Sequence, residues 1–397
     1  MKKLLGLLLL CISLLTSCSK SSKKDNALSE DQGKQSLEDN SIAVLNKFEE
    51  FRNDSALQEI EEFLEFLTTE ENTKNKEILK KVKNTLYIST QVKQNKISTV
   101  NYPSTLFAAI SAPSQTELEK EFNESVGTHT WNSNSDDFDF SESNDGKINF
   151  SVTQNNKTAV LTISNFSAYE HASGEEAPKS IKVELKVNNN KIMGIDYSAT
   201  IADNEYIPTK VSSSLSLGVL SYNAVVTNNN TDGSVNQSLN IGNTKVLGLD
   251  LSGKGNYAEI NNSGESNKTI DLLLNSANAT LYVGEISLSV DAKISDKLNE
   301  EIKTVENEVS ILNETFDITI KSGKNKIADG EFYIGTYSQM EYYYTGNGYV
   351  SEEVEYETPD VRLVFKDGSK STLEAYFEFG FEDMMDTADN TLNAYSE

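Results

Sequence analysis

Apolar residues recur at every second position over long stretches of this chain. One run places Ile181, Val183, Leu185 and Val187 between Lys182, Glu184 and Lys186, and two similar runs start at Ile286 and Leu373. Because successive side chains of a β-strand point to opposite faces, this alternation predicts strands with one buried face and one face in water. Half-buried strands are typical of antiparallel sheets, so the pattern restricts most of the chain to antiparallel β structure.

Residues that favour tight turns separate the runs. They are Asn144-Asp145-Gly146, Asn188-Asn189-Asn190, Asp232-Gly233 and Asp367-Gly368. Asn, Asp and Gly tolerate the positive φ angles of short hairpins, so each segment predicts a hairpin connection. Between Leu217 and Leu220 the apolar phase changes at Gly218, which indicates a bulge or a tight bend.

Helical spacing dominates before Gly127. We expect one helix that contains Ile42, Leu45, Phe48 and Phe51, a second that begins at Ser55, a third over residues 76–88 and a short fourth that ends near Ser125. A later helix is expected over residues 297–310. Ser55 with Gln58, and Ser114 with Glu117, have the spacing of a capping box. Early helices followed by many strands predict an α+β fold, with N-terminal helices packed on a large, mostly antiparallel β-sheet.

The first residues have the organisation of a secretory signal. Lys2 and Lys3 precede an apolar run, residues 4–15, which is too short to span a bilayer and ends in small residues before Cys18. This ending resembles the lipobox of bacterial lipoproteins, in which the signal is cleaved before the cysteine. The resemblance implies a diacylglyceryl group on Cys18, acyl chains such as palmitate, and attachment to a membrane.

The residues after Cys18 bear on location. In lipoproteins of well-studied Gram-negative bacteria an aspartate at the next position causes inner-membrane retention, so Ser19 implies an outer-membrane lipoprotein. Residues 18–40 are rich in polar side chains and predict a flexible tether. Lys23-Lys24-Asp25 is similar to the surface-export signal of Bacteroidota lipoproteins, but a solvated linker has the same composition. The periplasmic side and the cell surface therefore both stay open.

These patterns divide the chain into segments. We expect a lipoprotein signal peptide (1–17), a tether (18–40), a helical segment (41–126), an antiparallel β region (127–296), a helix with a C-terminal β unit (297–381) and an acidic tail (382–397). Removal of the signal would leave Cys18 as the remaining cysteine, so we expect no disulfide and no cysteine-based metal site.

Charge and residue content exclude several classes of function. The formal net charge of −26 repels nucleic acid, so we expect no nucleic-acid partner. The histidines are His129 and His171, and no serine lies in a G-x-S-x-G segment, which excludes the usual nucleophilic triads. Paired carboxylates for glycoside cleavage stay open, although Trp131 is the only tryptophan available to line a sugar cleft. We therefore expect no enzymatic activity and no cofactor.

Two acidic segments bear on metal binding. Asp136, Asp137, Asp139, Glu142 and Asp145 crowd one stretch, and oxygen ligands of this kind suit calcium. Asn228, Asn230, Asp232 and Gly233 imitate the start of an EF-hand loop, but Leu239 stands where that loop needs a glutamate. A hydrated strand end and a hairpin turn are the simpler interpretation, so no metal site is predicted and calcium binding stays open.

A series of strand-like segments resembles a known group of proteins. The segments are Gly127-Thr128-His129-Thr130-Trp131-Asn132, the acidic stretch 136–140, Gly146 to Phe150, and Val364 to Lys370. They resemble a family of uncharacterised Bacteroidota outer-membrane or surface lipoproteins that share a G-T-x-T-W-N strand opening and repeated hairpins. The resemblance implies a fold and a location but no activity. A looser, architectural similarity to periplasmic lipoprotein carriers implies a curved sheet that shelters acyl chains.

The strongest binding candidate is a tyrosine-rich segment. Tyr342, Tyr343, Tyr344 and Tyr349 surround Thr345-Gly346-Asn347-Gly348, and Tyr333, Tyr337, Tyr356 and Glu352, Glu353 and Glu355 lie nearby. Tyrosines around a glycine loop suit stacking on a sugar or contact with a protein partner. The alternative is a β-hairpin whose tyrosines pair across strands.

Two functions therefore stay open. The first is a non-enzymatic, lipid-anchored binding module for a glycan or an envelope protein. The second is a carrier that encloses a hydrophobic ligand, such as lipid or lipoprotein acyl chains, between the early helices and the sheet. In addition, Ser55 in Asp54-Ser55-Ala56 and Thr387 in Asp386-Thr387-Ala388 match the short O-glycosylation motif of Bacteroidota.

Overall fold

The structure is a computed structural model that describes residues 27–67, 117–135, 137–154, 156–170, 174–202, 208–229, 231–255, 274–294, 304–344, 349–373 and 375–376. The fold is α+β and mostly β, with a large, mostly antiparallel sheet, as the alternation predicts. In these ranges, no helix combines the length and the apolar character needed to span a membrane.

The chain separates into two compact units. Unit 1 comprises Met1–Ile42, Asn230–Asp232 and Asp250–Met385, and unit 2 comprises Ala43–Asn229, Gly233–Leu249 and Asp386–Glu397. The main boundary falls within β10 (Thr244–Gly255), whereas the sequence patterns place one between residues 296 and 297.

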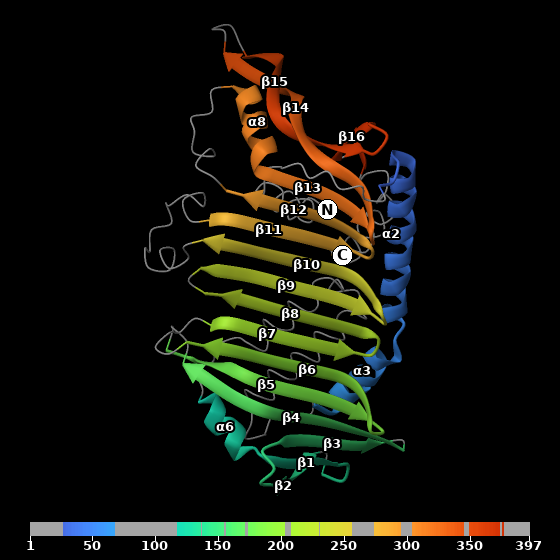
Figure 1. Cartoon of the computed structure of the whole chain (residues 1–397). Coiled ribbons are helices and arrows are strands. Elements are labelled where there is room, and N and C mark those ends of the chain that lie inside the picture. The colour runs from blue at the N-terminus through green and yellow to red at the C-terminus, as the bar shows by residue number, and fades with distance from the viewer. Residues whose placement is uncertain are drawn as a thin grey trace. The chain divides into compact units, whose positions relative to one another are not determined.

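In unit 2 the strands follow one another in space almost as they do in the sequence (Figure 1). They are β1 (Gly127–Asn132), β2 (Asp137–Glu142), β3 (Ile148–Gln154), β4 (Lys157–Glu170), β5 (Glu176–Val187), β6 (Asn190–Ile201), β7 (Pro208–Leu217), β8 (Leu220–Asn228) and β9 (Asp232–Ile241). The order is β2-β1-β3-β4-β5-β6-β7-β8-β9. β1 and β3 are parallel, and the other neighbours from β1 to β9 are antiparallel.

Turn chemistry explains these hairpins. Asn188 and Asn189 have φ angles of 48° and 67°, which the two-residue turn between β5 and β6 requires. Gly218, with φ of 51°, lies in the turn between β7 and β8, so the phase change there is a tight bend. The segment 144–146 joins β2 to β3, but β1 lies between those strands, so the expectation of a hairpin there is wrong.

Helices of unit 2 confirm part of the helical prediction. In α3 (Ser55–Leu67), Leu57, Ile60 and Phe63 are buried. α6 (Leu118–Glu124) ends next to Ser125, as expected, whereas residues 76–88 and Ser114 lie outside the described residues.

The cap of α3 differs from the prediction. Asp54 accepts hydrogen bonds from the N–H of Ala56 at 2.9 Å and from the N–H of Val219 at 2.7 Å. Asp54 caps the helix with one carboxylate oxygen and holds the β7–β8 turn with the other. The capping box predicted for Ser55 and Gln58 is therefore wrong.

In unit 1 consecutive strands are antiparallel neighbours. They are β11 (Leu274–Val283), β12 (Ile286–Lys293), β13 (Phe316–Ser322), β14 (Asn325–Tyr344), β15 (Tyr349–Phe365) and β16 (Lys370–Thr372). α8 (Val305–Thr315) joins β12 to β13. It begins at its N-cap Thr304 and continues past residue 310, the predicted end, while residues 295–303 lie outside the described residues.

The beginning of α2 (Glu30–Arg52) corrects the expectation of a tether up to residue 40. Ser29 and Gln32 form a reciprocal capping box, with bonds of 3.1 and 3.4 Å. Leu37 is fully buried among the side chains of β12, β13, β14 and β15. The Asn40 amide donates to the carbonyl of Val283 and accepts from the N–H of Glu285, both at 2.7 Å.

The strand predicted from Leu373 onward is also wrong where the structure describes it. β16 ends at Thr372, and Leu373, Ala375 and Tyr376 are helical. Tyr376 is fully buried, with its ring centroid 5.2 Å from that of Phe365. Residues 377–381 lie outside the described residues.

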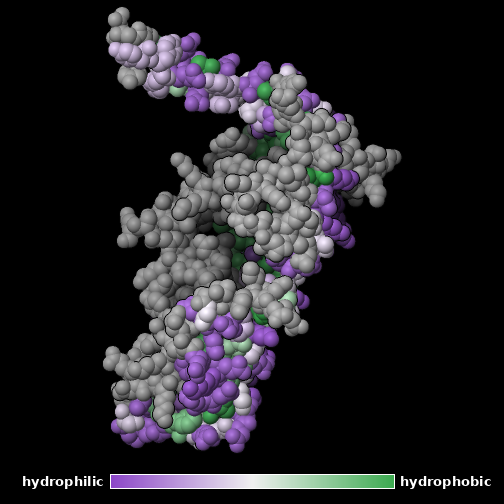
Figure 2. Space-filling model, turned by 90° about the vertical axis from the view of Figure 1, so that its left-hand side faces the viewer, coloured by the Kyte–Doolittle hydropathy of each residue, from purple (hydrophilic) through white to green (hydrophobic). Residues whose placement is uncertain are grey.

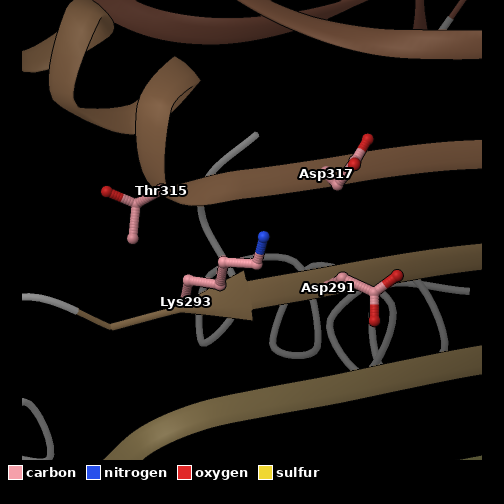
Figure 3. A pocket seen from close by; sticks show the side chains of 4 residues that line it. All are labelled: Asp291, Lys293, Thr315 and Asp317. Carbon is pink, nitrogen blue, oxygen red and sulfur yellow. The ribbon is translucent and has the colours of Figure 1, made fainter. Parts of the chain in front are cut away.

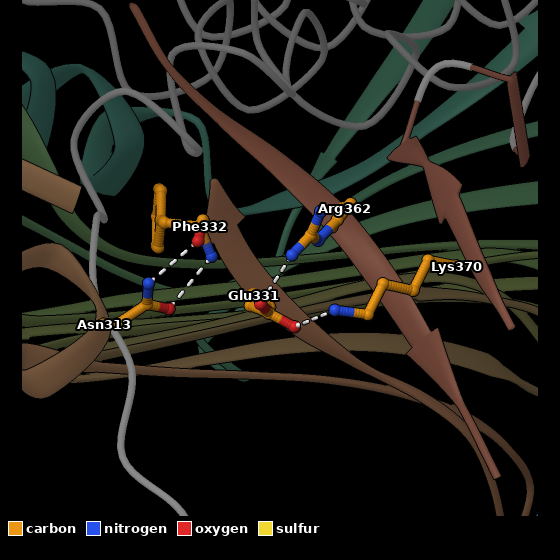
Figure 4. Close-up of polar contacts among 5 residues, drawn as sticks. All are labelled: Asn313, Glu331, Phe332, Arg362 and Lys370. Carbon is orange, nitrogen blue, oxygen red and sulfur yellow. Dashed lines mark hydrogen bonds and ion pairs between the residues drawn. The ribbon is translucent and has the colours of Figure 1, made fainter. Parts of the chain in front are cut away.

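β14 and β15 continue beyond their neighbours as a two-stranded ribbon. β13 pairs with β14 only up to Gly330, and β16 pairs with β15 only from Arg362. At the base of the ribbon, Asn313 of α8 donates to the carbonyl of Phe332 at 2.8 Å and accepts from its N–H at 3.0 Å (Figure 4). Asn313 thus replaces the neighbouring strand that β14 lacks at this point.

Candidate functional site

The tyrosines singled out in the sequence lie at the far end of this ribbon. We define the distal ribbon as residues 336–344 of β14 and 349–357 of β15, whose pairing is continuous from Thr336 with Glu357 to Tyr344 with Tyr349. Figure 2 shows it as an arm at the top of the view, mostly in hydrophilic colours with small hydrophobic spots. The predicted alternative, a β-hairpin with tyrosines paired across strands, is present.

Exposed apolar surface is concentrated on the distal ribbon. Among the described residues, every exposed large hydrophobic side chain except Ile42, Phe140 and Val226 lies there. The ribbon members are Tyr337, Met340, Tyr342, Tyr343, Tyr344 and Val350, and Tyr342 is 71% exposed. Aromatic side chains held in water in this way are typical of surfaces that become buried against a partner.

The regular pairing divides the ribbon into two faces. One face, which we call the tyrosine–glutamate face, consists of Tyr337, Gln339, Glu341, Tyr343, Val350, Glu352, Val354 and Tyr356. Tyr342 and Tyr344 lie on the opposite face with Met340, Glu353 and Glu355. The structure therefore separates the predicted tyrosines, and only the backbone position of Tyr349 is described, opposite Tyr344.

On the tyrosine–glutamate face each of two phenols is bonded to a carboxylate. The Tyr343 hydroxyl donates to Glu352 at 3.0 Å, and the Tyr356 hydroxyl donates to Glu341. These hydrogen bonds raise the pKa of both phenols, because each proton is held between the phenol and a negative charge. The rings of Tyr337 and Tyr356 stack with centroids 5.5 Å apart.

Two cationic side chains, Arg362 and Lys370, lie at the base of the same face. Glu331 accepts from Arg362 at 2.8 Å and from Lys370 at 3.2 Å (Figure 4). Partial burial raises the pKa of Glu331, but these two cationic donors outweigh it and leave the pKa below its ordinary value. The Arg362 guanidinium lies 4.9 Å from the ring centroid of Tyr333, whose hydroxyl donates to Asp360 at 2.8 Å.

Of the two histidines, His129 lies in the described part of the chain. His129 is buried in unit 2, with its ring 4.6 Å from that of Phe150 and 4.8 Å from that of Phe140. Burial lowers the pKa of His129 and so favours the neutral imidazole, and a long contact of 3.5 Å joins the ring to the Ser125 carbonyl. His171 lies outside the described residues.

The acidic segments are held by local hydrogen bonds. Asp139 accepts from Asn132 at 2.9 Å, and Asp145 accepts from Ser143 at 2.8 Å. Gly233 is opposite Asn228 in the β8–β9 hairpin, which matches the simpler interpretation of that segment. Where side chains are described, no three His, Cys, Asp or Glu residues gather in a way that could hold a metal ion. Asp136 and Asn230 lie outside the described residues.

A pocket in unit 1 bears on the carrier hypothesis. It has a volume of about 250 Å³ and is lined by Asp291, Lys293, Thr315 and Asp317, on β12, the end of α8 and β13 (Figure 3). Burial, together with Asp329 and Asp291, raises the pKa of Asp317. A lining of charged groups does not suit acyl chains, so this pocket gives the carrier no support.

The remaining predicted positions are modification sites. Ser55 is exposed at the first turn of α3, whereas the preceding Asp54 is bonded to the backbone and the following Ala56 is buried. Cys18 and Thr387 lie outside the described residues.

The sequence patterns did not indicate that Glu341 belongs to the tyrosine–glutamate face or that Arg362 lies at its base. Their signal is the strand register: the pairing of Tyr344 with Tyr349 places Glu341 opposite Glu352 and Arg362 opposite Glu331. Comparisons with protein-family models, with curated proteins and with solved structures gave no match.

Proposed function

We propose that this chain is a non-enzymatic, lipid-anchored protein of the bacterial outer membrane that binds a glycan or protein partner through the distal ribbon. The observation that carries the proposal is the concentration of exposed tyrosines on an arm that no other described strand covers. A two-stranded hairpin alone is only marginally stable in water, and these tyrosines add little to the core. Their exposure is better explained by contact with a partner, where aromatic side chains dominate binding energy.

The binding part of the proposal is tested with a tip variant, Tyr342→Ala/Tyr343→Ala/Tyr344→Ala. The purified protein, the tip variant and a Val226→Ala control, which shortens an exposed apolar side chain of unit 2, are each incubated with envelope polysaccharide and with envelope protein extract. We expect one of the two classes to bind, and the tip variant to lose about 2 kcal/mol or more of binding free energy. If the tip variant binds as tightly as the control, the ribbon is not the binding surface. The proposal is also wrong if the purified protein binds neither the polysaccharide nor the envelope proteins.

The anchor is supported by Lys2, Lys3, the apolar run that follows and the position of Cys18. We expect Cys18→Ala to abolish acylation, and the chain to leave the outer-membrane fraction. The measurement is cell fractionation with metabolic labelling by a palmitate analogue. A labelled or still membrane-bound Cys18→Ala protein would contradict the anchor without affecting the proposal for the ribbon.

A further inference from the structure

At the base of the ribbon, an arginine lies against a tyrosine whose hydroxyl is hydrogen-bonded to a carboxylate. The Tyr333 hydroxyl is bonded to Asp360, and the Arg362 guanidinium lies over the Tyr333 ring while bonding to Glu331. All four side chains belong to the same side of the β14–β15 pair as the tyrosine–glutamate face. A guanidinium is therefore held here by the aromatic face of Tyr333 and the carboxylate of Glu331 together.

The distal ribbon repeats this chemistry without the cation. Tyr343 is bonded to Glu352 and Tyr356 to Glu341, and Glu341 lies directly opposite Glu352 in the strand pair. Residues 336–361 contain no lysine or arginine. Like charges opposite each other destabilise a strand pair, so a cation placed between these glutamates would remove a repulsion as well as add an attraction.

Charge restricts the class of partner. The glutamates of the distal ribbon are Glu341, Glu352, Glu353, Glu355 and Glu357. Such a surface repels anionic polysaccharide and anionic headgroups, and two ribbons of the same kind would repel each other. The aromatic rings favour a planar, weakly hydrated cation over a compact one, which points to arginine rather than lysine.

We propose that the tyrosine–glutamate face binds an extended, arginine-bearing segment of another protein, with a guanidinium seated on the tyrosine rings and bonded to Glu341 and Glu352. This inference rests on the proposed function and specifies its partner. An extended segment carries alternate side chains on one side, so arginines at alternate positions reach the same face. Because the site is exposed, binding should weaken as salt is added.

The test uses a fluorescent peptide with arginines at alternate positions and the purified protein. The comparison peptides carry citrulline, which keeps the planar shape without the charge, or lysine. The Glu341→Gln/Glu352→Gln variant removes the two carboxylates of the face, and Glu353→Gln/Glu355→Gln removes the same charge from the opposite face. Fluorescence anisotropy gives the dissociation constants, and circular dichroism checks that both variants fold.

We expect the arginine peptide to bind the protein at least about tenfold more tightly than the citrulline peptide, since citrulline keeps N–H donors but lacks the positive charge that strengthens their hydrogen bonds to carboxylates. We expect a similar loss in Glu341→Gln/Glu352→Gln and a much smaller one in the opposite-face variant. Equal losses in the two variants, or equal binding of arginine and citrulline peptides, would overturn the inference. If the arginine peptide does not bind but polysaccharide or envelope protein still binds in a tip-dependent way, the proposed function stands and this inference is wrong. If neither the peptide nor either class of envelope material binds, both proposals are wrong.

Discussion

Asn313 holds the base of the ribbon to α8, and its removal should be measurable. Its amide makes two hydrogen bonds to the backbone of Phe332, at 2.8 and 3.0 Å, and Phe332 is buried. Each such bond contributes about 1 kcal/mol, and Asn313→Ala leaves a buried N–H and a buried carbonyl unpaired, which costs about 1 kcal/mol more. The gain in helix propensity from alanine returns about 0.5 kcal/mol. We expect a net loss of about 2.5 kcal/mol in the free energy of unfolding.

The matched control is Asn307→Ala, which replaces an exposed asparagine on the same helix. It gains the same helix propensity and loses no bond to β14, so its stability should stay equal or rise slightly. Urea denaturation measures the free energies, and hydrogen exchange follows the Phe332 N–H, whose bond to Asn313 closes this edge of β14. If Asn313→Ala is as stable as the control and the Phe332 exchange rate is unchanged, the anchoring role of Asn313 is refuted.

Three further changes test other contacts. Asn40→Ala removes the two hydrogen bonds that hold α2 to the β11–β12 turn and should lower the free energy of unfolding by about 2 kcal/mol. Asn53→Ala removes one exposed hydrogen bond from the residue after α2 to the Glu49 carbonyl and should change the free energy of unfolding by less than about 1 kcal/mol. Similar losses in the two variants would contradict the docking of α2. Gly33→Ala would place a Cβ 2.5 Å from the Tyr376 hydroxyl oxygen. Urea denaturation should therefore show a free energy of unfolding lower by about 1–3 kcal/mol, despite the better helix propensity of alanine. A higher free energy of unfolding would refute this close packing. Burial lowers the pKa of His129 below 6.5, so the unfolded chain takes up its proton first and stability should fall as pH drops through and below 6.5. His129→Phe should reduce that fall in urea titrations, and unchanged pH dependence would show that His129 is not its source.

Local chemistry was sufficient to predict much of the sheet. The alternation in β5, the paired asparagines before β6 and the phase change at Gly218 each depend on neighbours in sequence, and each prediction is confirmed. The start of α2 was missed because its docking face uses Gly33, Ser36 and Asn40 rather than a stripe of large apolar residues. A polar composition that looks like a tether can therefore form a packed helix when the partner strands supply the apolar surface.

The candidate site was predicted only in part, for a related reason. The tyrosines are visible in the sequence, but their division between two faces depends on a register fixed by the pairing of Tyr344 with Tyr349. Ile42 illustrates the same limit, since it fits the predicted apolar stripe yet is 45% exposed, while Val44 is buried. Spacing gives the period of a helix or strand, and only the packed partner decides which side is covered.

The contacts of α2 within unit 1 have a consequence for the order of folding. Ser36 bonds to Ser322, 286 residues later in the sequence, and Asn40 bonds to Val283, 243 residues later, whereas β11 to β16 each pair with the next strand along the chain. Short-range hairpins close quickly, and contacts across such long separations close slowly. As the chain is synthesised, its hairpins can therefore assemble one after another, and the amino-terminal turns of α2 dock after the last of them has formed.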